Sequence, residues 1–407
     1  MESDEGVEWM WQTALSVWKA NEEKPSWCET VLYEILSHAK VTPETLMGWR
    51  DPAPDKSIYK DLESYTDNAG YDSIVADVAR NEWYRRQVQA VSDMLRRDDA
   101  RRILRWIDIG AGDEALLTMY VLKASRRNHV VSIEANEVSA FSSLTKVRRY
   151  VGAKKPRVTV LCGKAGDPTV QDPDTLDTVR FPVACYDVCV VEMFGPLVSS
   201  EGLIHAVKRL GELEGVGQHV HAFIPSRVCT MMVPVDLLSC PIVISCVQSK
   251  VLLCDALPID SMQLSPVHHA METYDLLEEL KTPRRGMRTT TCTWVIGDER
   301  SFHGFASYIL FSGETGEQSS NASIEGSCTN WPNAFFPVGG GEWTVRPNDT
   351  IICKTEIDVD SNPEASYVLT TRLVRDGAEV GIDCLRFDYH DILCRSDTFH
   401  EAKLLIP

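Results

Sequence analysis

The 407-residue sequence has no long apolar run, little positive charge and no cysteine spacing typical of a metal site. Its most apolar stretch, residues 220–254, is broken by Arg227, Asp236 and Lys250. It cannot supply the roughly 20 apolar residues of a membrane-spanning helix. The first residues, Met-Glu-Ser-Asp-Glu-Gly, are acidic, whereas a secretory signal starts with a basic segment. We therefore expect neither a membrane segment nor export.

Positive charge is scarce over the whole chain. The 41 Lys and Arg face 59 Asp and Glu, which gives a formal net charge of −18. A surface that follows phosphates needs clustered excess base, so we expect no direct nucleic-acid binding. A basic, arginine-rich polypeptide fits better as a partner, because long-range attraction would draw it to an acidic protein.

The 13 cysteines are scattered from Cys28 to Cys394. Even the closest pair, Cys185 and Cys189, lacks the Cys-x-x-Cys spacing and the second cluster of a zinc site. We interpret them as reduced thiols that mostly pack in the core, and we predict no metal. This usage indicates a cytoplasmic protein, with the nucleus as an additional location.

Three regions differ in their pattern along the chain. Residues 1–57 have helical periodicity and four tryptophans before a Pro-rich boundary, so we expect a helical extension. Residues 58–226 begin with an expected helix over 65–95 and then alternate β-rich runs with helices, which is typical of a parallel sheet. Residues 227–407 have β-rich segments and glycine-rich turns, which predict mostly antiparallel sheet.

Nine short β-rich runs are predicted to be strands. The predicted strands are 103–109, 129–133, 157–161, 186–191 and 219–223 in the parallel half, and 289–296, 302–311, 350–357 and 365–373 in the antiparallel half. A charged segment, residues 268–281, is predicted to be a helix inserted among the antiparallel strands.

A glycine-rich loop follows the first predicted strand, with Gly110 and Gly112, and Glu134 ends the next strand. Such glycines let the backbone approach a cofactor, and an acid 24 residues after Gly110 can hold ribose hydroxyls. Neither common fingerprint is complete. The last glycine of Gly-x-Gly-x-x-Gly is replaced by Ala115, and that of Gly-x-Gly-x-Gly by Glu114. The loop alone leaves a cofactor site and a tight structural turn both open.

Two glutamates follow the predicted strand 186–191. Glu192 and Glu201 are nine residues apart and lie where the carboxyl end of the strand meets the sheet edge. Parallel sheets bind ligands at that edge. Because an unpaired buried carboxylate is costly, solvated loop charges are the alternative interpretation.

These motifs, in this order, resemble those of the protein arginine methyltransferase family, in which a double-glutamate loop grips the substrate guanidinium. The segments 64–84, Ile224-Pro-Ser-Arg227 and Thr329-Asn-Trp331 resemble further family motifs, and the likeness covers residues 60–375. The loop 194–202 resembles that of the monomethylating type III branch, which we take as the closest. The segment 331–337 also resembles the symmetric-dimethylating type II branch.

The resemblance implies a fold and an assembly. We expect a Rossmann-like S-adenosylmethionine-binding domain followed by a β-barrel substrate domain. Residues 235–288 would be a helical dimerisation arm inserted in the barrel, with a surface excursion as the alternative. The implied assembly is a homodimer or a heterodimer with a related methyltransferase.

The resemblance also implies roles for individual residues. Glu192 and Glu201 would be catalytic, since two carboxylates can grip the five-donor guanidinium and offset its repulsion from a sulfonium. The implied ligands of S-adenosylmethionine are Arg80, Asp108, Gly110, Gly112, Glu134 and Asp167, and the implied lining of the arginine pocket is Tyr65, Asp77, Asn330 and Trp331.

Four positions depart from the family pattern. Glu114 replaces a glycine, Asn330 replaces the loop histidine, Asp61 replaces a common aromatic residue, and Ile74 replaces a usual methionine. The first three motivate a second hypothesis, a catalytically inactive paralogue that activates or scaffolds an active relative. A methyltransferase with another acceptor is a third hypothesis, which a cation-gripping acid pair disfavours.

Overall fold

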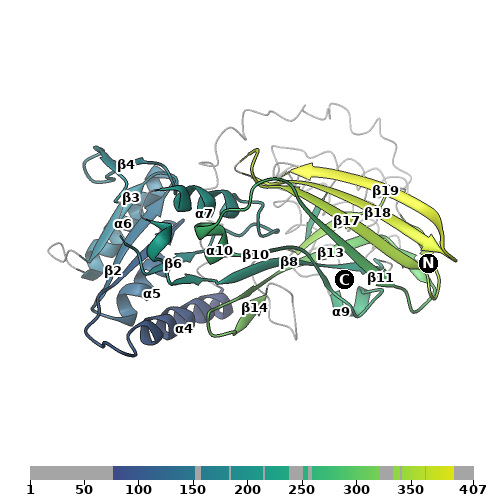
Figure 1. Cartoon of the computed structure of the whole chain (residues 1–407), viewed down its shortest axis with the longest axis horizontal. Coiled ribbons are helices and arrows are strands. Elements are labelled where there is room, and N and C mark those ends of the chain that lie inside the picture. The colour runs from purple at the N-terminus through teal and green to yellow at the C-terminus, as the bar shows by residue number, and fades with distance from the viewer. Residues whose placement is uncertain are drawn as a thin grey trace, which may run out of the picture.

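The computed structural model describes residues 77–151, 157–182, 185–213, 216–237, 251–254, 259–320, 333–339, 342–362 and 364–388. The expected N-terminal extension, residues 1–57, lies outside these ranges. The described chain is elongated, with a parallel-sheet half at one end and antiparallel strands at the other (Figure 1). No helix in the described part is both long and apolar enough to cross a membrane.

The first half is a seven-stranded sheet in the order β5-β4-β3-β2-β1-β6-β7. The five parallel strands are β1 (Leu104–Ile109), β2 (Asn128–Glu134), β3 (Val158–Cys162), β6 (Val188–Val191) and β7 (Ala222–Ile224). They confirm the predicted parallel strands, although β7 begins later than expected. The short antiparallel strands β4 (Thr169–Gln171) and β5 (Thr178–Arg180) were not predicted, because three residues carry too little pattern.

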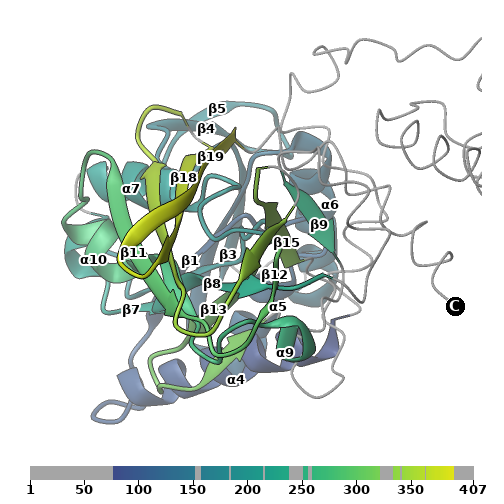
Figure 2. The same ribbon diagram turned by 90° about the vertical axis from the view of Figure 1, so that its right-hand side faces the viewer.

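Helices cover both faces of this sheet. The right-handed crossovers place α5 (Leu116–Ala124) and α6 (Glu137–Val151) on one face and α7 (Leu203–Glu212) on the other (Figure 2). The helix α4 (Val78–Leu95) packs beside α5. The helix α10 (Leu276–Lys281) reaches back from the antiparallel half and lies against α7 so closely that a Cβ on Gly211 would overlap the Leu280 carbonyl oxygen.

The second half is built from antiparallel sheets. Their orders are β10-β8-β13-β15-β9, with β14 beside β13, then β11-β17-β18-β19, and the pair β12-β16. The strands that the sequence predicted are β11 (Arg288–Val295), β13 (Gly304–Ser312), β17 (Thr350–Asp358) and β18 (Ser366–Arg375). The others are β8 (Arg227–Val235), β9 (Leu252–Cys254), β10 (His269–Asp275), β12 (Arg300–Phe302), β14 (Gln318–Ser320), β15 (Asn333–Pro337), β16 (Trp343–Val345) and β19 (Ala378–Asp388). A further short helix is α9 (Ile259–Met262).

The predicted helix over residues 268–281 was wrong in its first half. Residues His269–Asp275 form β10, which pairs antiparallel with β8 and buries Met271 and Tyr274. Tertiary pairing here overrides the local helical pattern, which survives only in α10. The described part of the expected arm, residues 235–288, thus includes a strand and a helix that pack on this chain itself. Its dimerising role stays a prediction.

Aromatic packing joins the two halves. Trp83 of α4 meets Phe311 of β13 edge to face, with ring centroids 4.7 Å apart. Phe194, just after β6, stacks on the same ring at 5.8 Å. Each such pair contributes about 0.5–1.5 kcal/mol beyond its buried area. The start of α4 and the segment after β6 are therefore held against the antiparallel half by one shared core.

Candidate functional site

The carboxyl ends of β1, β2 and β6 meet at one edge of the parallel sheet. In the strand order, β1 lies between β2 and β6, and the chain leaves it first toward β2 and later returns to the other side at β6. Such a reversal opens a crevice outside the strand ends, where open α/β sheets bind ligands. The predicted glycine loop, Glu134 and Glu192 all follow these three strand ends.

The loop after β1 has the backbone of a close-approach turn. Gly110 and Gly112 have φ angles of +74° and +63°, which side chains disfavour. The amide of Gly110 donates to the Ile133 carbonyl at 2.9 Å, which ties the loop to β2. A Cβ on Gly110 would lie 2.8 Å from Met193 Cγ. Glycine therefore lets this loop lie directly against the segment that follows β6.

Glu134 is buried at the end of β2 and is oriented by backbone donors. Its Oε2 accepts from the Gly112 amide at 2.8 Å, and its Oε1 accepts from the Asn136 amide at 2.9 Å. Burial raises the pKa of this carboxyl, while these hydrogen bonds oppose the shift. A carboxylate has about four acceptor positions, so the oriented group can still accept hydroxyl donors.

Asp108 lies fully buried under the glycine loop. Its Oδ2 accepts from the Thr118 hydroxyl at 2.6 Å, while its Oδ1 has no hydrogen-bond partner in the described chain. Burial raises the pKa of Asp108 to about 7. Buried polar atoms are nearly always paired, so an orphaned carboxylate oxygen below the glycine loop is consistent with a missing polar partner.

Glu114 does not obstruct the loop. Its side chain is exposed, and its carboxylate forms an ion pair with Lys146 of α6 at 2.5 Å. Lys146 also lies 3.3 Å from Asp113. The charge that the sequence placed in the motif is therefore compensated on the outer side of the loop.

An ion pair connects α4 to the residue that follows β6. Asp77 caps the helix by accepting from the Arg80 amide at 3.0 Å. Arg80 Nη1 lies 3.1 Å from Glu192 Oε1, and both side chains are largely buried. One helical turn further on, the Tyr84 hydroxyl donates to the Val191 carbonyl at 2.9 Å. Burial raises the pKa of Glu192, and Arg80 opposes that shift.

Glu201 differs from Glu192 in that no positive charge faces it in the described chain. Its carboxylate has no hydrogen-bond or ion-pair partner among the residues that the structure describes. Burial, followed by the negative charge of Glu192, raises the pKa of Glu201 to about 8. Glu201 is half-buried. A partly desolvated carboxyl beside a like charge is an energetically unfavourable arrangement that a cation would relieve.

The segment 192–201, here called the double-acid loop, is anchored to the antiparallel half. Ser199 donates its hydroxyl to Glu272 Oε2 at 2.5 Å, and Thr230 donates to Glu272 Oε1 at 2.6 Å. Ser199 also lies 2.7 Å from the Tyr367 hydroxyl, and Tyr274 donates to Glu272 at 3.0 Å. Sequence reasoning missed this network, because Glu272 lies in the segment predicted to be an inserted helix.

The remaining predicted residues divide into two groups. Asp167 lies after β3, and its carboxylate is 3.9 Å from Arg209 of α7, both half-exposed. Its role toward a cofactor stays a prediction. Tyr65, Asn330, Trp331 and Asp61 lie outside the described residues. The structure brings together Asp77, Arg80, Asp108, Gly110, Gly112, Glu134, Glu192 and Glu201 around one edge of the sheet.

Comparison with known proteins finds similarity in the fold and not in the sequence. No protein-family model and no curated protein matches the sequence. Protein arginine methyltransferase 10 of Arabidopsis thaliana matches in structure with a TM-score of 0.58 and 13% identity, over 78% of this chain and 97% of that one. A chain of the Trypanosoma brucei PRMT1 enzyme-prozyme heterotetrameric complex with AdoHcy matches with a TM-score of 0.60 and 13% identity. The match covers 80% of this chain and 100% of that one. The expected fold class, a Rossmann-like domain followed by a β-barrel-type domain, is confirmed.

Proposed function

We propose that this chain is an S-adenosylmethionine-dependent protein arginine N-methyltransferase. One observation carries the proposal: Arg80 pairs with Glu192 at 3.1 Å, while the neighbouring half-buried Glu201 has no partner in the described chain. The site thus offers one compensated and one uncompensated carboxylate beside a glycine loop. The shared fold of two arginine methyltransferases supports this function.

The described residues fit the proposed cofactor. Glu134 is oriented to accept ribose hydroxyls, the two glycines leave room along the loop, and Arg80 is a buried cation for the methionine carboxylate. Asp108 Oδ1 supplies an unused acceptor beneath the loop. Bound there, S-adenosylmethionine supplies the methyl group. Asp167 completes the proposed set on the side of the adenine.

Glu192 and Glu201 would hold the acceptor arginine. A guanidinium keeps its charge at any physiological pH and presents a planar fork of donors, which suits two carboxylates better than one. The ion pair with Arg80 holds Glu192 in place, so Glu192 can orient the bound guanidinium. The guanidinium in turn supplies Glu201 with a positive counter-charge. Holding one nitrogen in line with the methyl donor lowers the barrier by positioning and by electrostatic stabilisation.

The finer features of the activity are part of the proposal. We favour monomethylation of arginine-rich proteins, on the likeness of loop 194–202 to the type III branch. Tyr65, Asp77, Asn330 and Trp331 are proposed to line the arginine pocket. The proposed assembly is a homodimer or a heterodimer with a related methyltransferase, in the cytoplasm and the nucleus.

An inactive paralogue that supports an active relative is the second candidate. It is favoured by Asn330 and Asp61 at two departing positions, and by the structural match to a chain of an enzyme-prozyme complex. The ion pair of Glu114 with Lys146 weakens it, because the altered glycine position no longer puts an uncompensated charge at the cofactor loop.

Titration of the purified full chain with S-adenosylmethionine by calorimetry tests the proposal first. We expect binding in the micromolar range, followed by a mass gain of 14 Da per methyl on an arginine-rich peptide but not on its lysine analogue. Cofactor binding without transfer, restored only by a co-purifying relative, would establish the second candidate. Absence of both binding and transfer would refute the enzyme proposal.

A further inference from the structure

The amino ends of the parallel strands form a surface whose charge opposes that of the whole protein. Residues 96–157 hold 14 of the 41 Lys and Arg but only 7 of the 59 Asp and Glu, although the chain carries a net charge of −18. Five of those seven acids, from Asp108 to Glu137, lie at or just after the carboxyl ends of β1 and β2. Most of the described basic residues of this segment instead precede β1, β2 or β3 and lie toward the opposite edge of the sheet, whereas Lys146 pairs with Asp113 and Glu114 at the carboxyl edge.

Three loops bring arginines together there. They precede β1, β2 and β3. Arg105 of β1 pairs in register with His129 of β2. The amide of Val130, the residue after His129, donates a hydrogen bond to the Arg157 carbonyl. Arg127 Nη1 donates to the Arg101 carbonyl at 3.4 Å, which joins two of the loops. The arginine face, as named here, consists of Arg97, Arg101, Arg105, Arg126, Arg127 and Arg157.

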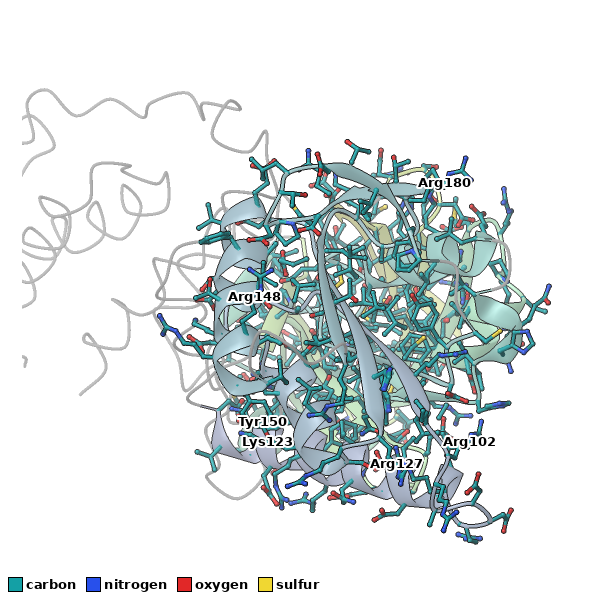
Figure 3. The ribbon with its side chains drawn as sticks, turned by 90° about the vertical axis from the view of Figure 1, so that its left-hand side faces the viewer. Arg102, Lys123, Arg127, Arg148, Tyr150 and Arg180 are labelled. Carbon is teal, nitrogen blue, oxygen red and sulfur yellow. The ribbon has the colours of Figure 1, made fainter. Side chains whose placement is uncertain are left out.

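These six guanidiniums have no carboxylate partner in the described chain. Arg127 and Arg157 donate only to backbone carbonyls, and all except the half-buried Arg157 are exposed. Two nearby acids already have other partners. Asp187 pairs with Arg102 at 2.5 Å, and Asp99 accepts a hydrogen bond from the Arg101 amide at 2.8 Å. Asp98 is the remaining acid between residues 96 and 107. Figure 3 views this end of the molecule, with Arg102 and Arg127 near each other.

The chemistry of the face favours phosphate over a protein surface. Protein interfaces place apolar and aromatic residues at their centre and are depleted of charge there. Here Ile103 is the one exposed large apolar side chain between residues 96 and 129. Guanidiniums match phosphate oxygens with two parallel hydrogen bonds, and several of them spaced along an edge suit a chain of repeated charges. The absence of an apolar wedge likewise disfavours a membrane surface.

We propose that the arginine face binds the phosphate backbone of a nucleic-acid strand. The net charge of −18 conceals this site, because the excess acid lies on other parts of the chain. Binding would occur at the edge opposite the double-acid loop, one strand length away, so it does not depend on the proposed methyl transfer. A cationic substrate segment would be repelled from the arginine face and directed to the acidic edge.

Fluorescence anisotropy of a labelled single-stranded RNA of about 20 nucleotides with the purified full chain tests the proposal. If six phosphates are contacted, log affinity should fall with log salt concentration with a slope of about −4. The triple variant Arg101→Ala, Arg105→Ala, Arg126→Ala should reduce the slope to about −2 and weaken binding at least tenfold at low salt. A DNA strand and a duplex of the same sequence, used in parallel, identify which phosphodiester source is preferred.

A matched control separates this site from general charge effects. The triple variant Arg284→Ala, Arg285→Ala, Arg372→Ala removes the same charge from exposed arginines of the antiparallel half. It should bind RNA as tightly as the unaltered chain. Equal loss in both variants, equally tight binding of poly-glutamate or of anionic lipid vesicles, or no RNA binding at about 50 mM salt would each overturn the proposal.

Discussion

Ser199 of the double-acid loop and Glu272 of β10 are joined by two hydrogen bonds, from the serine hydroxyl at 2.5 Å and from its amide at 3.4 Å. Because the single hydroxyl hydrogen of Ser199 goes to Glu272, the Tyr367 hydroxyl, 2.7 Å away, must donate to Ser199. Glu201 is two residues further along the loop. The antiparallel half therefore sets the position of an acid that the parallel-sheet half carries.

Replacement of two tyrosines should separate positioning from stability. Tyr367→Phe removes the hydrogen bond to Ser199, whereas Tyr186→Phe removes one to the Pro182 carbonyl, which lies outside the loop. Both should lower the free energy of unfolding by about 0.5–1.5 kcal/mol. We expect only Tyr367→Phe to lower kcat, about fivefold, with KM and cofactor affinity unchanged. Equal kinetic losses in both variants would contradict a positioning role.

Glu192→Gln should remove methyl transfer while leaving cofactor binding in place. The substitution keeps the shape but removes the charge that faces Arg80 and the proposed guanidinium. We expect kcat to fall by about 10²–10³-fold, as for loss of one preorganised electrostatic group. Calorimetry should give an S-adenosylmethionine affinity within threefold of the unaltered chain. Loss of cofactor binding or of folding would mean that Glu192 is structural.

Glu201 should make stability depend on pH. Its pKa is about 8 in the folded chain and near 4.5 when unfolded, so the folded state holds the proton more tightly. The resulting stabilisation is full below about pH 4.5 and is lost as pH rises through 8. Glu201→Gln removes this dependence, so the variant should unfold at a higher temperature than the unaltered chain at about pH 8.5, by a margin that disappears near pH 5. A constant margin would contradict the raised pKa.

Guanidinium binding should release a proton from the same group. Below pH 8 the Glu201 carboxyl is largely protonated, and a bound cation favours its ionised form. Calorimetric titration of an arginine-rich peptide at about pH 7, in two buffers with different ionisation enthalpies, should show close to one proton released. Glu201→Gln should abolish the difference between the buffers.

Two glycines with nearly equal φ angles allow a matched test of the cofactor loop. Gly110 (φ +74°) lies against Met193, whereas a Cβ on Gly316 (φ +79°) would meet no atom within 4 Å. Alanine at either site should cost about 1–2 kcal/mol from its backbone conformation alone. Gly110→Ala should cost more and also weaken S-adenosylmethionine binding at least tenfold, while Gly316→Ala leaves it unchanged. Equal effects would remove the argument for close approach.

The parallel-sheet half could be predicted largely from sequence, because its strands are continuous apolar runs. β6, for example, is Val188–Val191 and is buried on both faces. Strands next to water carry less signal. β19 has 11 residues, of which Phe387 alone is buried and the rest are exposed or half-buried, and it was missed. β10 was predicted as helix because its acidic and aromatic residues become strand-like only through pairing with β8.

The candidate site was predictable in its residue identities but not in its electrostatics. The glycines, Glu134 and both loop glutamates could be named from motif order, and the structure shows Arg80 paired with one glutamate and not with the other. Sequence spacing cannot distinguish a compensated carboxylate from an open one. Nor could it show that Glu114 faces Lys146, because that contact joins residues 32 positions apart on separate elements.

Stacking of Phe194 on Phe311, together with the Ser199–Glu272 bonds, makes the two halves thermodynamically inseparable. A chain shortened to the parallel-sheet half would keep every proposed cofactor ligand yet expose Phe194, Trp83 and Ser199 to water. Such a fragment is expected to be poorly soluble and to lose the geometry of its second acid. Exchange of the antiparallel half between related proteins would consequently alter turnover as well as substrate choice.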